Sequence, residues 1–291
     1  MLNRFKTYQL NLRGREVTIE RPWVMGILNV TPDSFYAESR RMTEQGLQER
    51  VEQMVTEGAD MIDVGAYSTR PGAAVVEPEE EILRLSLALE VVKRVSPDVY
   101  VSVDTFRSRV AQLAVEEFGV DVINDVSGGT LDPEMSRTVA RLHVPAVVMH
   151  MRGTPATMQQ LSQYDNVVGD VLSELAQTIA LWWQAGVTQI IADPGFGFRK
   201  TLDQNYELLS GLEAFHSLEV PLLVGVSRKS MIYKALGCTP QDALNGTVVI
   251  NTLALLQGAH ILRVHDVRAA VEACTLIETL NRNNKHSKLS L

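Results

Sequence analysis

Cysteine is scarce in this sequence, and long apolar runs are missing from it. The 291 residues include only Cys238 and Cys274, which lie far apart without the spacing of metal ligands, so we expect two reduced thiols in a cytoplasmic protein. No stretch approaches the ~18 uninterrupted apolar residues of a membrane helix, and the first residues lack the apolar core of a secretory signal. A net charge of -8 argues against a broad nucleic-acid surface. It leaves room for an anionic substrate, because local clusters of Lys and Arg decide that.

The length of the chain suits one large unit. A (β/α)₈ barrel, also called a TIM barrel, takes ~250 residues, so we expect residues 1–291 to form a single barrel domain. Residues 1–21 are expected as an N-terminal extension, in which 8–21 form a β-hairpin around Arg13-Gly14. This hairpin is predicted to cap the bottom of the barrel.

Eight short apolar runs end in polar or charged residues, and stretches with helical periodicity separate them. The runs predict strands at 24–29, 61–65, 100–104, 120–124, 146–150, 189–193, 222–226 and 260–264. The polar ends are Asn29, Asp63, Asp104, Asn124, His150, Asp193, Ser227-Arg228-Lys229, and Arg263 with His265. In a TIM barrel the carboxyl ends of all strands meet at one mouth, where such enzymes do their chemistry. The pattern therefore predicts both an α/β barrel and the place of its site.

A glycine repeat supports closure of the barrel. Four expected helices stop at a glycine, a residue that suits the left-handed position after a helix, namely Gly58, Gly119, Gly186 and Gly258. Asp63, Asn124 and Arg263 each lie five residues after such a glycine, which indicates one repeated βα unit. An open doubly wound sheet is the alternative. The tryptophan pair Trp182 and Trp183 is expected to pack its helix against the barrel.

Two loops on the predicted mouth are long. Residues 31–43 and 67–78 exceed what βα turns need, and both contain proline, so we interpret them as lids over the site. The helix expected at 241–257 has more apolar surface than one barrel face requires, which suggests a dimer contact.

Charged residues gather at the ends of the last strands. Ser227-Arg228-Lys229-Ser230 and Arg263-Val264-His265-Asp266 each lead into a helix, and helix N-termini bind anions. Alternatively, these cations pair with acids on the rim of the barrel. The polar ends Asp104, Asn124 and Asp193 would satisfy the amino and ring N–H groups of a flat heterocycle, or else hydrogen-bond to loop backbone. Asp63 fits either an interior hydrogen-bonding role, which is the favoured one, or the mouth. His150 and Arg152 follow the fifth strand and fit either the lining of the mouth or its rim.

Five motifs together resemble the dihydropteroate synthase family. They are MGILNVTPDSF at 25–35, STRPG at 68–72, DPGFGF at 193–198, VSRKS at 226–230 and RVH at 263–265. The resemblance covers essentially the whole chain in the right order. It implies a TIM barrel, usually a homodimer, that joins 6-hydroxymethyl-7,8-dihydropterin diphosphate to 4-aminobenzoate in folate biosynthesis. It also implies release of pyrophosphate, use of Mg²⁺ and inhibition by sulfonamides.

The resemblance assigns roles to residues of this chain. It implies that the pterin is held by Asp104, Asn124, Asp193 and Lys229, and the diphosphate by Asn29, Arg263 and His265. Asn29 would also bind Mg²⁺, and Thr69 would touch the diphosphate or the aromatic acid. The aminobenzoate pocket would consist of Phe35, Arg70, Pro71, Phe198 and Ser230. The residues expected to act in catalysis are Asp104, Asp193, Lys229, Arg263 and His265.

Two other functions compete with this interpretation. A pterin-dependent methyltransferase shares the barrel and its acidic floor, but it serves a corrinoid partner and does not need the Thr-Arg-Pro-Gly lid or the Ser-Arg-Lys-Ser cluster. A non-catalytic pterin-binding barrel is the second alternative. Such a barrel would have little use for Asn29, Lys229, Arg263 and His265 together.

Overall fold

The computed structural model describes residues 5–30, 40–67, 76–153 and 163–287. Strands and helices alternate along most of this range. In order, the elements are β1 (Tyr8–Leu12), β2 (Arg15–Ile19), β3 (Trp23–Asn29), α1 (Arg40–Thr56), β4 (Met61–Gly65), α2 (Pro78–Val95), β5 (Tyr100–Asp104), α3 (Ser108–Phe118), β6 (Val122–Asp125), α4 (Met135–Leu142), β7 (Ala146–Met149), α5 (Val167–Gln184), β8 (Ile190–Asp193), α6 (Leu202–Ser210), the 3₁₀ helix η3 (Leu212–Leu218), β9 (Leu223–Val224), α7 (Ser230–Leu236), α8 (Leu244–Leu256), β10 (Ile261–Val264) and α9 (Val267–Ser287). None of the helices within these ranges is both long and apolar enough to span a bilayer.

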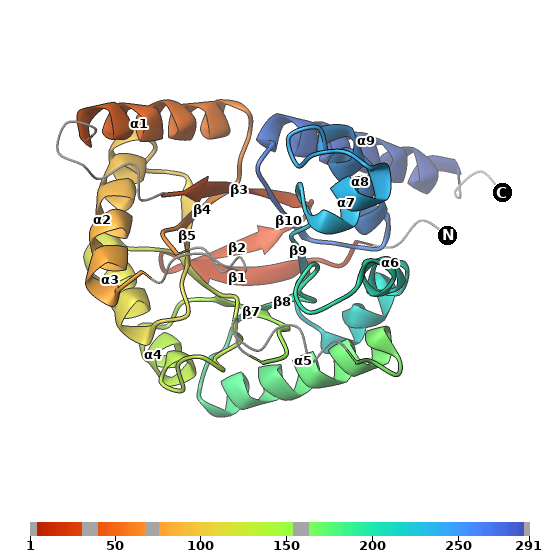
Figure 1. Cartoon of the computed structure of the whole chain (residues 1–291), viewed down its shortest axis with the longest axis horizontal. Helices are drawn as coiled ribbons and strands as arrows, with labels where there is room; N and C mark the ends of the chain where they lie inside the picture. The colour runs from red at the N-terminus through yellow and green to blue at the C-terminus, as the bar shows by residue number, and fades with distance from the viewer. Residues whose placement is uncertain (1–4, 31–39, 68–75, 154–162, 288–291) are drawn as a thin grey trace.

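The eight strands from β3 to β10 form one parallel sheet that curls into a barrel, with the helices outside it (Figure 1). The strand order is β8-β7-β6-β5-β4-β3-β10-β9. A parallel bridge between Ala192 and Leu222 links the two ends of this order, and the backbone N–H of Ala192 donates to Pro221 at 2.9 Å. The predicted TIM barrel is confirmed, and the open doubly wound alternative is wrong because the outermost strands meet each other.

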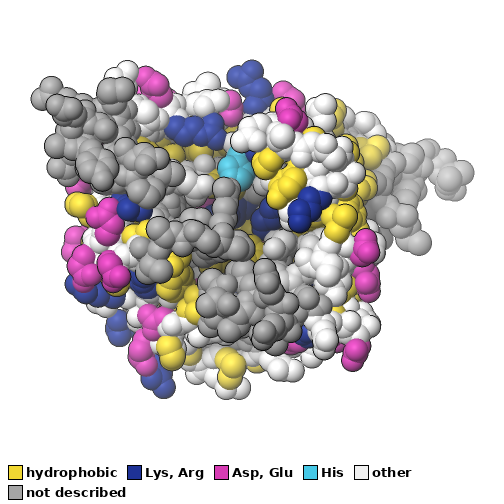
Figure 2. Space-filling model, in the orientation of Figure 1, with side chains coloured by type: hydrophobic (Ala, Val, Ile, Leu, Met, Phe, Trp, Pro, Cys, Tyr) yellow, Lys and Arg dark blue, Asp and Glu magenta, His cyan; other side chains and the backbone are white. Residues whose placement is uncertain are grey.

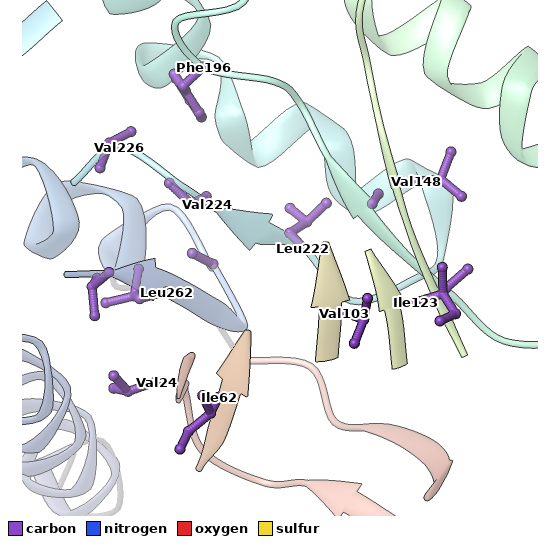
Figure 3. Packing of buried hydrophobic residues seen from close by; sticks show 14 of the residues in the cluster. Val24, Ile62, Val103, Ile123, Val148, Phe196, Leu222, Val224, Val226 and Leu262 are labelled. Atoms are coloured by element: carbon purple, nitrogen blue, oxygen red, sulfur yellow. The ribbon is translucent and has the colours of Figure 1, made fainter. Parts of the chain in front are cut away.

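Alternate residues along each strand face opposite sides of the barrel wall. Val24, Ile62, Val103 and Ile123, on four successive strands, pack in one core together with residues of the surrounding helices (Figure 3). Their neighbours with the opposite parity belong to a second core inside the barrel, which includes Met25, Met61, Val122, Val147, Ile191, Leu223 and Ile261. The apolar runs are therefore buried on both faces, as parallel strands covered by helices require.

The N-terminal hairpin closes one end of the barrel. β1 and β2 pair antiparallel, and Leu10, Leu12 and Ile19 join the inner core with Trp23 at the start of β3. Figure 1 shows the hairpin crossing the centre of the barrel. The predicted cap at the bottom is confirmed, so the open mouth lies at the carboxyl ends of the strands.

Helix ends follow the glycine pattern. Gly58, Gly119, Gly186 and Gly258 all have positive φ, between 64° and 100°. The expectation for the tryptophan pair is half right. Trp182 is buried and its Nε1 donates to the Gly128 carbonyl at 3.1 Å, whereas Trp183 is 48% exposed. Adjacent positions on a helix point about 100° apart, so one side chain of the pair must turn away from the barrel.

Two strands have a limit that differs from the expected one by more than one residue. The expected strand 222–226 is only Leu223–Val224, because its ladder with β10 ends at Leu262 and the chain then bends into the loop that bears Lys229. The expected strand 120–124 is Val122–Asp125. Asp121 stays outside it and accepts a hydrogen bond from the backbone N–H of Val101 at 2.8 Å.

Candidate active site

A layer of polar side chains lies directly above the inner core of the barrel. The parity of the strands puts them there, because each comes two residues after an inward-facing position. The layer consists of Asp63, Asp104, Asn124, Asp193 and Arg263, and we call it the polar floor. Asp104 on β5 pairs in register with Asn124 on β6, and the backbone of Asp193 on β8 pairs with Met149 on β7. The period of two that buries the strands therefore also aims these side chains at the mouth.

Arg263 is bonded to two other members of the polar floor. Its Nε donates to Oδ2 of Asp63 at 2.6 Å, and its Nη2 donates to Oδ2 of Asp104 at 2.7 Å. The side-chain amide of Asn124 donates to the same Asp63 oxygen at 3.1 Å. Asp63 is thereby assigned to the floor, where it positions Arg263, and the structural role favoured for it is consistent with these bonds.

Burial shifts the pKa values of the floor. Burial raises the pKa of Asp104 to about 7, against the opposing effect of the Arg263 guanidinium. Burial also raises the pKa of Asp193, while Lys229 and the backbone N–H of Gly195 oppose that rise. For Arg263, burial works toward a lower pKa, but Asp63 and Asp104 outweigh it and raise the pKa. Arg263 is thus a permanent cation beside Asp104, whose carboxyl titrates near neutral pH.

Lys229 approaches the floor from the loop after β9. Its Nζ donates to the carbonyl of Phe196 at 2.6 Å and lies 4.7 Å from the centre of the Phe198 ring. Burial lowers the pKa of Lys229 to about 8, and the charge of Asp193 opposes this shift. An ammonium, a carboxylate and an aromatic ring therefore meet at the same edge of the mouth. Asp193, Lys229 and Arg263 share one region, as the predicted site requires.

Within the two predicted cation clusters, His265 and Arg228 have different kinds of partner. The backbone N–H and ring Nδ1 of His265 lie 3.1 and 3.0 Å from the hydroxyl oxygen of Ser227, which joins the loops after β9 and β10. Arg228 instead forms a two-pronged ion pair with Asp266, with Nε–Oδ2 at 2.8 Å and Nη2–Oδ1 at 2.9 Å. For Arg228 the alternative interpretation, an ion pair with an acid of the rim, is therefore correct. Arg228 has a φ of 55°, a left-handed backbone conformation, and its ion pair with Asp266 anchors its side chain in that conformation.

The other predicted site residues lie around this mouth or outside the described ranges. Asn29 is exposed at the end of β3, and Ser230 is the first residue of α7. Lys and Arg side chains and a histidine are visible near the centre of this face (Figure 2). Both predicted lids fall largely at residues 31–39 and 68–75, which lie outside the described residues, as do the site residues expected within them, Phe35, Thr69, Arg70 and Pro71.

Sequence reasoning missed the contacts beneath the loop after β8. His150 is buried, and its Nε2 lies 3.0 Å from Glu174 on α5, so it is not an exposed residue of the rim. Its Nδ1 lies 3.2 Å from Nζ of Lys200. The position of Lys200 two residues after the DPGFGF motif was the one available signal, and it says nothing about the partners of the side chain.

Comparisons with known proteins agree on one family. A model of the family described as pterin binding enzyme matches residues 25–265. The dihydropteroate synthase of Escherichia coli K12 is 42% identical over 275 residues, covering 93% of this chain and 95% of that protein. The Xanthomonas albilineans dihydropteroate synthase with 4-aminobenzoic acid is 38% identical, with a TM-score of 0.86 over 95% of this chain and 99% of its own. The same enzyme in complex with 7,8-dihydropteroate is 36% identical, with a TM-score of 0.83 over 94% of this chain and 99% of its own.

Proposed function

Because this chain belongs to the dihydropteroate synthases, within the pterin-binding enzymes, we propose that it joins 6-hydroxymethyl-7,8-dihydropterin diphosphate to 4-aminobenzoate and releases pyrophosphate. It is thus a transferase of folate biosynthesis. The observation that carries the proposal is the polar floor, in which Arg263 joins Asp63 and Asp104 beside Asn124. Family membership favours this reaction over methyl transfer to a corrinoid partner.

The floor suits a flat pterin ring. Asp104 and Asp193 offer carboxylate oxygens to amino and ring N–H groups, and Asn124 offers both a donor and an acceptor. Lys229 contributes further N–H donors from its place beside the loop after β8, where it contacts Phe196. These groups already have fixed partners, so the ring would meet donors and acceptors that are positioned in advance.

The harder chemical task is to expel pyrophosphate from the methylene carbon of the pterin. Arg263 and His265 lie at the end of β10, where they would hold the diphosphate. Nη1 of Arg263 makes no hydrogen bond among the described residues, so it is available for a phosphate oxygen while Nε and Nη2 stay on the floor. Fixed cations stabilise the charge that grows on a leaving group, and they need no reorganisation to do so.

Asn29 fits a Mg²⁺ role through its chemistry and place. Its amide oxygen is a ligand type that Mg²⁺ accepts, and it lies exposed at the mouth, where Oδ1 would be 3.6 Å from a Cβ on Gly65. No group of three or more His, Cys, Asp or Glu able to hold a metal occurs in the described part of the chain. Mg²⁺ in phosphate sites commonly takes one or two protein ligands plus substrate oxygens. When bound, the ion would neutralise charge on the departing diphosphate.

Cleavage of the C–O bond is proposed to run ahead of attack by the aniline nitrogen, which is a modest nucleophile. The electron-rich pterin can support positive charge at its methylene, and Asp104 and Asp193 favour that charge electrostatically. A large secondary deuterium isotope effect at the methylene is expected. An effect near zero would mean concerted displacement instead.

A turnover assay tests the function directly. The purified chain, given the pterin diphosphate, 4-aminobenzoate and Mg²⁺, should release pyrophosphate and 7,8-dihydropteroate in equal amounts. Binding of the pterin without pyrophosphate release would indicate the non-catalytic barrel and overturn the proposal. Omission of 4-aminobenzoate is the control for simple hydrolysis.

The assembly is proposed to be a homodimer in the cytoplasm. Val249 and Leu253 on α8 and Leu276 and Leu280 on α9 are 57%, 43%, 71% and 44% exposed. Each pair is spaced by four residues, so each forms a stripe on its helix. Exposed apolar stripes of this kind support an interface between two copies. Both cysteines are free thiols, which suits a reducing compartment.

A further inference from the structure

The side chain of Lys200 binds the backbone of the loop after β8. Nζ of Lys200 donates to the carbonyl oxygens of Gly195 at 2.8 Å and Phe198 at 3.1 Å, and it lies 3.2 Å from Nδ1 of His150. These three contacts use all three N–H groups of an ammonium. None of the ion pairs found in the described part of the chain gives Lys200 a carboxylate partner, so its charge depends on more distant groups.

His150 connects this ammonium to a carboxylate. Because a lysine ammonium can only donate, Nδ1 of His150 must accept, and the ring proton therefore sits on Nε2. That nitrogen points to Glu174, at 3.0 Å. Burial lowers the pKa of His150 to about 4, so the ring is neutral at physiological pH. Nε of Arg152 lies 3.0 Å from both oxygens of Glu174 and fixes the carboxylate in turn.

The loop that Lys200 holds is the one that receives Lys229. The carbonyl of Phe196 accepts from Nζ of Lys229, and the Phe198 ring lies beneath the same atom. The residues that Lys200 binds, Gly195 and Phe198, stand on either side of Phe196. Gly195 also donates its backbone N–H to Asp193 at 2.8 Å. Any change in the position of this loop would therefore move two groups of the candidate pterin site.

We propose that Lys200 is a positioning residue of the active site, which acts with His150 and Glu174 to hold the loop 194–198 so that Lys229 points at the pterin. Lys200 itself does not touch the substrate. The identity of that substrate rests on the proposed function, but the positioning of Lys229 does not. Precise placement of a binding group by the residues around it is worth large factors in affinity and rate.

The charges around Lys200 make this support sensitive to pH. Burial lowers the pKa of Lys200 to about 7, Lys229 and Arg152 lower it further, and Asp193 and Glu174 raise it. The ammonium is present below that pKa and is lost as the pH rises through it. The neutral amine has only two N–H groups for three acceptors, so the loop should loosen on the alkaline side. Removal of the Glu174 charge should shift this change to lower pH.

Nuclear magnetic resonance of ¹³C-labelled lysine follows Lys229 without any substrate. Because its Nζ lies over the Phe198 ring, the ε-protons of Lys229 should show an upfield ring-current shift. In Lys200→Met the shift should be lost. In Glu174→Gln the shift should disappear at lower pH than in the unaltered protein. Glu134→Gln, which removes an exposed partner of Arg137, is the matched control and should change nothing.

Kinetics provide the second readout. The KM for the pterin diphosphate should rise about tenfold in Lys200→Met, with a smaller change in kcat, because a weakened binding contact is expected to cost about that factor. In Glu174→Gln the alkaline rise in this KM should begin at lower pH. An unaltered Lys229 signal in both variants would overturn the proposal, even if both lose thermal stability. If Lys200→Met does not fold, Glu174→Gln decides alone. An inactive protein with the expected Lys229 shifts would contradict the proposed function but support the positioning role.

Discussion

Nε of Arg263 lies 2.6 Å from Oδ2 of Asp63, a residue 200 positions earlier in the chain. Through this contact and the one to Asp104, β10 is tied to β4 and β5 across the interior of the barrel. The second oxygen of Asp63 is buried and has no hydrogen-bond partner in the described ranges. Asp63 therefore acts through Oδ2 alone, which accepts from both Arg263 and Asn124 and holds the cation of the polar floor in place.

Asp63→Asn tests that relationship. Asparagine keeps the shape of the side chain but removes its charge, so Arg263 loses one of its two carboxylate counterions. The free energy of unfolding should fall by about 1.5–3 kcal/mol, the range for hydrogen bonds to charged groups, and kcat/KM for the pterin substrate should fall roughly tenfold or more. Urea denaturation and steady-state kinetics measure the two effects. Asp98→Asn, at an exposed turn, serves as the control. Wild-type values for both quantities in Asp63→Asn would contradict the assigned role.

Asp104 should set the acidic limit of activity. Burial raises the pKa of Asp104 to about 7, so the carboxyl becomes neutral as the pH falls through that value. A neutral carboxyl loses its attraction to Arg263 and to N–H groups of the pterin. The value of kcat/KM for the pterin should therefore decline below about pH 7, since this parameter reports groups of the free enzyme. Asp104→Asn should be less active and should lack this decline. Persistence of the acidic limb in Asp104→Asn would assign it to another group.

Gly195 is predicted to be irreplaceable by alanine. Its φ is 72°, and a Cβ there would lie 2.1 Å from the His150 carbonyl oxygen. Gly195→Ala should lower the free energy of unfolding by about 2–5 kcal/mol, the sum of backbone strain and an overlap that the loop must move to relieve. Gly119→Ala is the matched control, because its φ is 64° and nothing lies within 4 Å of the added atom. It should cost about 1–2 kcal/mol. If thermal or urea unfolding gave the same loss of unfolding free energy for both variants, the contact with His150 would make no contribution.

The proposed dimer depends on the apolar stripes of α8 and α9. Val249→Glu places a charge at a side chain that is 57% exposed in the single chain. If a second copy covers it, the buried charge should dissociate the dimer, and sedimentation should show a species of half the mass. Leu181→Glu on α5 is the control, since that side chain is 63% exposed but lies apart from the stripes. An unchanged sedimentation profile for Val249→Glu would exclude this surface as the interface.

Local patterns in the sequence are sufficient for the architecture and for the membership of the polar floor. The apolar runs and the repeated glycines specify a βα unit, and the period of two specifies which side chains face inward. Asp63, Asp104, Asn124, Asp193 and Arg263 were predicted from their places at the ends of these runs. The motif resemblance supplies the family, which the comparisons confirm. All of these are properties of neighbouring residues, and neighbours in sequence carry that information directly.

Only the tertiary structure decided which side chains pair with each other across the barrel. The sequence shows Arg228 and Asp266 as two charges 38 residues apart, and only the approach of the loops after β9 and β10 makes them a pair. The same holds for Arg263 with Asp63 and for Lys200 with His150. Charge attraction falls with distance, and the distance between side chains on different strands is set by closure of the barrel rather than by spacing along the chain. The sequence alone therefore determined which residues reach the mouth, and the closed barrel determined which of them support the others.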